Sequence, residues 1–202
     1  MAEMEGGGNA QDQSRKKVLS LTLARTLLPA TAFGLAALAI VGAGLTIPIP
    51  GTGVVTDPRE IFTTVGAALT GPLGGIVIGI LAGIGEPGGV MLASVLAHVS
   101  GGLWMGFSYK NLVHNPLKMP ASLIGWVFLV LAYYYLFVVP GFVIGQAIFN
   151  SEGFNELYGA GTSLMRAYTV LGWGALPEAL LTALVTSLVL VALPIRYRRP
   201  LW

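Results

Sequence analysis

The sequence predicts an all-α, polytopic membrane protein, a six-helix bundle with a short second helix and both termini cytoplasmic. Three observations lead to this fold class. The 202 residues are 54% hydrophobic and 10% charged, whereas a soluble domain carries about 25% charged residues. Their mean hydropathy is +0.76. Charges are absent from long windows, and they sort by sign between the loops that join these windows.

Composition also limits the domain organisation. We expect residues 1–17, a polar stretch rich in Gly and Gln, to be a disordered cytoplasmic tail. Residues 18–202 are expected to form a single transmembrane helical domain, because about 200 residues hold roughly five to seven spans. The chain has no cysteine, which excludes disulfides and thiolate chemistry. The net charge of +2 comes from basic residues beside hydrophobic windows, so we expect no nucleic-acid partner.

Taken in order, five windows are long and apolar enough to be membrane spans. The first follows a basic segment, and the third holds a histidine as its one titratable side chain inside the membrane. The last is interrupted only by Glu178, near its start. The windows cover residues 26–56, 61–85, 87–109, 119–151 and 169–195.

The loop charges favour an even number of crossings. Basic residues at 15–17 and 196–199 lie near the two ends of the chain, and the positive-inside rule places both ends in the cytoplasm. The second window meets this condition if it is a hairpin of two short helices that turns at Gly71 and Pro72, because Gly-Pro breaks helices. The acidic residues after Asp12 then fall near the outer face. A re-entrant loop over residues 61–85 is the alternative.

Small residues recur every four positions in two of the predicted helices. One face carries Gly75, Gly79 and Gly83, and the first helix carries Ala32 and Ala36. Small residues allow two helix backbones to approach closely in a membrane. Both faces are therefore candidates for packing within the chain, which we favour, and for docking of a partner.

Two carboxylates and a tryptophan are candidate ligand-binding residues. Glu86 lies in a turn at the outer rim, where it is either solvated or directed into the bundle. Glu178 follows Trp173 and Pro177 at the expected start of the last helix, where an acid is also favoured by the helix dipole. The alternative is that Trp173 and Glu178 together line an outward-facing pocket for a cationic or hydrogen-bonding ring.

Two further polar residues are weaker candidates. Arg59 is expected to pair with Asp57 or Glu60 at the surface, or else to contact the ligand. His98 lies in the third window and is expected to make an interhelical hydrogen bond, with a ligand role as the alternative. No hydrolase, nucleotide-binding or zinc motif is present, so we expect neither an enzyme nor a metal site or cofactor.

The pattern "LTIPIP…TDPREIFTTVGAALTGPLGGIVIGILAGI" resembles the front half of substrate-binding S components of energy-coupling factor (ECF) transporters. The resemblance implies a subunit in the cell membrane that binds a vitamin, a vitamin precursor, a metal or a similar micronutrient near the outer surface. It implies a coupling transmembrane subunit and an ATPase pair as partners, with Ala32 and Ala36 on the docking face. No signature of a particular vitamin is recognised.

Two other classes stay open. The stretch from Asp57 also resembles the membrane input domain of autolysis-type sensor histidine kinases. No signalling module follows Trp202 in the sequence, and we therefore expect transport rather than sensing. A structural subunit of a larger membrane complex is the third possibility, and it predicts that Glu86 and Glu178 are merely solvated.

Overall fold

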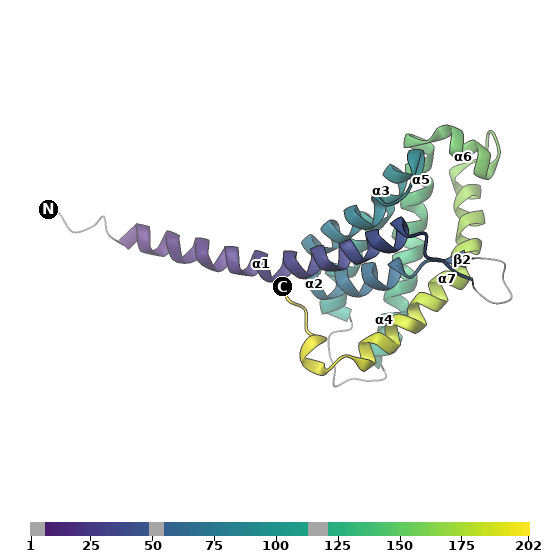
Figure 1. Ribbon diagram of the computed structural model, residues 1–202. Coiled ribbons are helices and arrows are strands. Elements are labelled where there is room, and N and C mark those ends of the chain that lie inside the picture. Colours follow the sequence, from purple (N-terminus) through teal and green to yellow (C-terminus); the bar gives the residue numbers. More distant parts are fainter. Residues whose placement is uncertain (1–6, 49–54, 113–120) are drawn as a thin grey trace.

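The computed structural model describes residues 7–48, 55–112 and 121–202, and helices dominate the described chain (Figure 1). Two short strands pair in antiparallel fashion in the loop before α2. The elements are α1 (Gly7–Gly42), β1 (Ile47–Pro48), β2 (Val55–Thr56), α2 (Arg59–Gly83), η1 (Gly88–Val90), α3 (Met91–Leu112), α4 (Ala121–Ala132), η2 (Tyr133–Val138), α5 (Val139–Phe149), α6 (Ser151–Tyr158), α7 (Leu164–Ala192) and η3 (Ile195–Tyr197).

Five segments are long and apolar enough to cross a membrane, which agrees with an all-α, multi-pass membrane protein. They are Leu23–Gly42, Arg59–Gly83, Gly88–Asn111, Leu123–Phe149 and Leu164–Ala192. The helix α1 begins well before its apolar part, at Gly7. Residues 7–17, part of the segment expected to be a cytoplasmic tail, form the first turns of this helix. Residues 1–6 lie outside the described part.

The helix α2 reverses direction at Gly71, whose φ of 78° and ψ of −172° are not helical. Arg59 Nη1 lies 3.4 Å from the carbonyl oxygen of Ala82. In a straight helix these two residues would be about 34 Å apart. The predicted reversal at Gly71 and Pro72 is thus present, and each arm, residues 59–70 and 72–83, is about 18 Å long. Neither arm alone spans a hydrocarbon core of about 30 Å.

The tip of this hairpin lies beside the C-terminal residues. The ring of Trp202 packs directly on Gly71, and the backbone N–H of Leu201 donates to the carbonyl oxygen of Leu69 at 2.8 Å. Next to the tip, Gly74 faces Ala30 of α1, whereas Gly85, at the other end of the hairpin, faces Val41. The part of α1 that precedes Ala30 therefore lies at the same end of the hairpin as the C-terminus.

The glycine face of α2 packs on α3 of the same chain. A Cβ atom at Gly79 would lie 2.6 Å from the backbone carbonyl of His98, and Gly75 and Gly83 meet the α3 backbone in the same way, at Gly102 and Val95. This face has no room for another molecule. Gly75, Gly79 and Gly83 therefore do not dock a partner, which corrects that expectation. They pack within the chain, as the favoured interpretation predicted.

The alanine face of α1 has a different environment. Ala32 is exposed and Ala36 is half-buried, while α1 packs on α2 through other residues, among them Phe33 against Gly66. Among the described residues, this face is therefore open at Ala32 and partly covered at Ala36.

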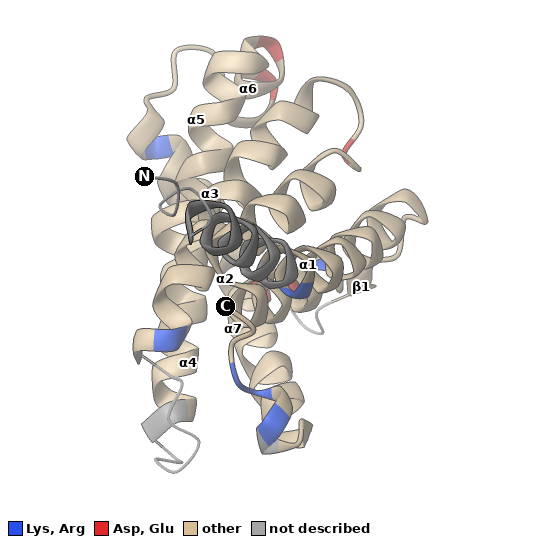
Figure 2. Cartoon of the chain, turned by 90° about the vertical axis from the view of Figure 1, so that its left-hand side faces the viewer, with Lys and Arg blue, Asp and Glu red and all other residues tan. Residues whose placement is uncertain are grey.

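The helices α5 and α7 run across α1 and α2 rather than alongside them (Figure 1). The segment α4–η2–α5 is continuous and packs against α3 and α7. Trp126 and Thr186 join α4 to α7 through a buried hydrogen bond of 2.8 Å. Acidic residues lie on α6 at one end of the molecule, and basic residues follow α7 at the opposite end (Figure 2).

We expect the variant Gly71→Ala to lower the melting temperature by about 3–8 °C, because a positive φ costs an L-residue about 1–2 kcal/mol and the new methyl group would meet the ring of Trp202. Thermal unfolding of the detergent-solubilised chain measures this. Gly44→Ala is the matched control, since Gly44 also has a positive φ but has no atom within 4 Å of the added Cβ. Equal losses in the two variants would show that Trp202 is not packed on the tip.

Candidate functional site

The open end of the α2 hairpin, the start of α3, η2 and the middle of α7 surround a cavity of about 150 Å³. Polar and charged groups line one part of it, and aliphatic and aromatic groups line the rest. The residues that line it are Arg59, Glu60, Glu86, Ser94, His98, Tyr134, Val138, Val139, Phe142, Leu171, Ala175 and Glu178. Four of the five candidate ligand-binding residues thus lie around one cavity.

Arg59 closes the mouth of the hairpin. Its guanidinium forms an ion pair of 2.9 Å with Asp57 and one of 2.6 Å with Glu86, which follows the second arm. Asp57 also accepts the backbone N–H of Arg59, the first residue of α2, at 2.9 Å. The pairing with Asp57 was predicted, but it is not a surface pair, because the Arg59 side chain is only 12% exposed.

The carboxyl group of Asp57, just before α2, is affected in opposite directions by burial and by Arg59. Burial raises the pKa of the Asp57 carboxyl above its ordinary value, while the adjacent Arg59 guanidinium acts in the opposite direction. Removal of the guanidinium would therefore leave a carboxyl that is costly to keep ionised.

Glu60 is the centre of the polar network, because its carboxylate contacts three other side chains. Its side chain is 4% exposed. One carboxylate oxygen lies 2.8 Å from His98 Nε2, and the other accepts hydrogen bonds from Tyr133 Oη at 2.6 Å and from Thr63 Oγ1 at 2.7 Å. From the sequence, Glu60 is expected only among the acidic residues near the outer face, and its place in the site is a finding of the structure. The only feature of the sequence that points to Glu60 is weak, namely an acidic residue in the first turn of an otherwise apolar window.

His98 connects this network to α3. Its Nδ1 lies 2.7 Å from the carbonyl oxygen of Ser94, which can only accept a hydrogen bond. The same Nδ1 lies 3.2 Å from Ser94 Oγ, and Nε2 lies 2.8 Å from the Glu60 carboxylate, so the ring joins α3 to α2. The interhelical hydrogen bond expected for His98 is present, and the same ring also lines the cavity.

The π-helical segment η2 presents two consecutive tyrosines to the site. Tyr133 reaches Glu60, and Tyr134 Oη lies 3.3 Å from Glu178 Oε1 and 3.0 Å from Thr182 Oγ1. In a regular α-helix, the side chains of neighbouring residues point about 100° apart. The two tyrosines lie instead in a π-helical segment, and such segments are frequent at functional sites.

The structure corrects the positions of Glu178 and Trp173. The helix α7 begins at Leu164, with Ser163 as its capping residue, so Glu178 lies in the middle of the helix and gains nothing from its N-terminal dipole. Trp173 is 73% exposed and lines a different groove, of about 310 Å³, with Tyr135 and Tyr168. Five positions along a helix correspond to a rotation of about 140°. Trp173 and Glu178 therefore cannot line the same pocket.

The arrangement can bind a polar ligand through buried charges and hydrogen-bond donors. Among the side chains that the structure describes, no three His, Asp or Glu are placed to hold a metal ion. Comparison with protein families, with curated proteins and with solved structures finds no match to the chain.

Proposed function

We propose that the chain is the membrane-embedded, solute-binding subunit of an ECF-type uptake transporter in the cell membrane. Its solute is a vitamin, a vitamin precursor or a similar micronutrient. One observation supports this above all, namely a cavity lined by Arg59, Glu60, Glu86, His98 and Glu178 between apolar helices. Ionisable groups inside a membrane protein are costly and are a mark of ligand or ion sites. A purely structural subunit has no need for them.

The charge distribution supports an orientation with both termini in the cytoplasm. Basic residues follow α7, at the end opposite the acidic α6 (Figure 2), and the tip of the α2 hairpin lies with the C-terminal residues. By the positive-inside rule, that end faces the cytoplasm. The mouth of the hairpin and the cavity then face the outer side, where an uptake subunit captures its solute.

The docking of the coupling subunit is assigned to the alanine face of α1. Ala32 is exposed and Ala36 is only partly covered by the chain's own described helices, and small residues allow the close helix contact that membrane association requires. The glycines of α2 do not contribute to this surface, since α3 covers them.

Affinity purification through an N-terminal tag, followed by mass spectrometry, tests the proposal. We expect a coupling transmembrane subunit, two ATPases and a retained small molecule. The variant Ala36→Trp should lose the coupling subunit and the ATPases but keep the small molecule, whereas Gly174→Ala, at an open position on α7, should keep both. Co-purification with unrelated membrane complexes alone, and without a small molecule, would refute the proposal.

A further inference from the structure

Three carboxylates line the cavity, those of Glu60, Glu86 and Glu178, and a fourth, that of Asp57, lies beside it on Arg59. Asp57 and Glu86 both contact the Arg59 guanidinium, and Glu60 contacts His98. Glu178 has neutral partners, the hydroxyl groups of Tyr134 and Thr56. Among the described residues, no ion pair is recorded for Glu178.

The charges at the site are also unequal in number. Four carboxylates stand against one guanidinium and one histidine ring, and the histidine and the guanidinium are already engaged by the other acids. A carboxylate between membrane helices without a cation is unfavourable. An added positive charge beside Glu178 would relieve this imbalance.

The rest of the cavity is apolar and small. Val138, Val139 and Phe142 come from η2 and α5, and Leu171 and Ala175 come from α7. The volume of about 150 Å³ is close to that of a protein cavity that holds a benzene ring. The site therefore offers a carboxylate for a positively charged head and an apolar pocket for a body of roughly ring size.

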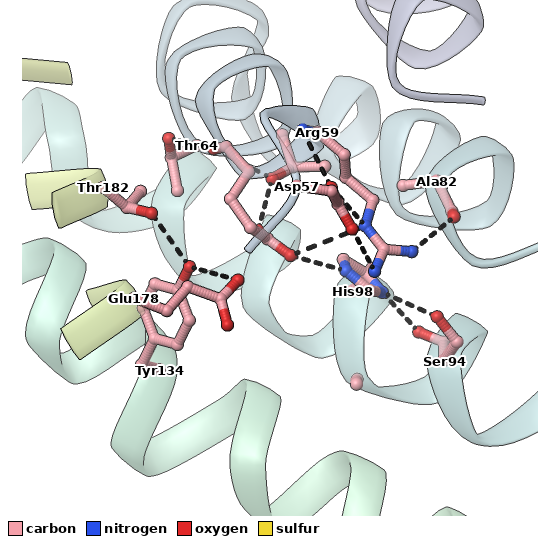
Figure 3. A network of polar contacts seen from close by, with 12 residues as sticks. Asp57, Arg59, Thr64, Ala82, Ser94, His98, Tyr134, Glu178 and Thr182 are labelled. Carbon is pink, nitrogen blue, oxygen red and sulfur yellow. Dashed lines mark hydrogen bonds and ion pairs between the residues drawn. The ribbon is translucent and has the colours of Figure 1, made fainter. Parts of the chain in front are cut away.

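We propose that this cavity binds a small organic cation, a primary amine or amidine with a compact apolar body, and that Glu178 is its counter-ion. The proposal rests on the proposed function, since it names the chemical class of the solute for that same site. The ammonium group donates hydrogen bonds to the Glu178 carboxylate, and Tyr134 holds that carboxylate in place (Figure 3). The apolar body packs between Phe142 and Leu171.

Three probes of matched size and different charge test the proposal. We expect benzylamine, a cation, to bind to the purified chain in lipid nanodiscs, and neutral benzyl alcohol and anionic benzoate to bind at least about tenfold more weakly by isothermal titration. Glu178→Gln should weaken benzylamine binding by about 10- to 100-fold. The control Glu152→Gln, on the exposed surface of α6, should leave it unchanged.

A second variant guards against misfolding of the first. Ala175→Leu adds apolar volume to the cavity wall and leaves Glu178 in place. It should also abolish benzylamine binding while the melting temperature is retained.

Two outcomes would overturn the cation assignment. Equal binding of benzyl alcohol or benzoate would do so, as would benzylamine binding that is unaffected by both variants. The proposed function fails differently, by the absence of a coupling subunit and of ATPases, and that result would leave a charge-selective cavity intact.

Discussion

Replacing Gly79 with alanine is expected to lower the melting temperature of the chain by about 6–12 °C, corresponding to a loss of about 3 kcal/mol. The added methyl group would lie 2.6 Å from the carbonyl carbon and oxygen of His98 and from the backbone nitrogen of Val99. Backbone atoms cannot rotate away as a flexible side chain can, so α3 has to move as a unit. Thermal unfolding in detergent or nanodiscs measures the effect.

The matched control for this variant is Gly174→Ala. Gly174 lies inside α7, and a Cβ atom there would have no neighbour within 4 Å. Alanine is the better helix former, so this change should be neutral or slightly stabilising. If Gly79→Ala proves as harmless as the control, α2 and α3 are not in backbone contact at this point.

The variant Arg59→Met is expected to destabilise the chain by about 3–5 kcal/mol, with a fall in melting temperature of about 10 °C or more. Removing the guanidinium leaves Asp57 and Glu86 without their cation and opens the hairpin mouth. The loss of stability caused by Arg59→Met should become smaller as the pH falls. A carboxyl such as Asp57, whose pKa burial raises in the folded chain, takes up a proton on folding, and stability then increases toward acidic pH.

Arg166→Met serves as the comparison, because Arg166 is exposed near the start of α7 and an exposed charge contributes less than about 1 kcal/mol. Unfolding curves at two pH values, one neutral and one mildly acidic, separate the two variants. A small loss for Arg59→Met, or a deficit that grows toward acidic pH, would show that the mouth is not closed by buried ion pairs.

Local features of the sequence were sufficient for the outline of the fold. The reversal at Gly71 follows from a Gly-Pro pair in the middle of an apolar window, which is a local effect of the backbone. The glycine face also follows from local spacing, since three glycines at intervals of four must lie on one side of a helix. Which helix covers that face depends on the tertiary structure. The spacing of the glycines is equally compatible with a docking surface for a partner.

The polar network was harder to predict because its members are distant in sequence. Glu60 and His98 are 38 positions apart, and Glu60 and Tyr133 are 73 apart. In the sequence, Glu60 looks like any acid that begins a helix. The separation of Trp173 from Glu178, by contrast, follows from helical geometry alone once α7 is known to continue through both.

Trp202 packs against Gly71, and the backbone N–H of Leu201 donates a hydrogen bond to Leu69. These contacts determine where a tag can be attached to the protein. A fusion partner joined directly after Trp202 would disturb the packing of this residue against the bend at Gly71. Measurements on such a fusion would therefore describe an altered molecule. Reporter and affinity sequences belong instead at the other terminus, ahead of α1, whose first turns stand clear of the packed helices (Figure 1).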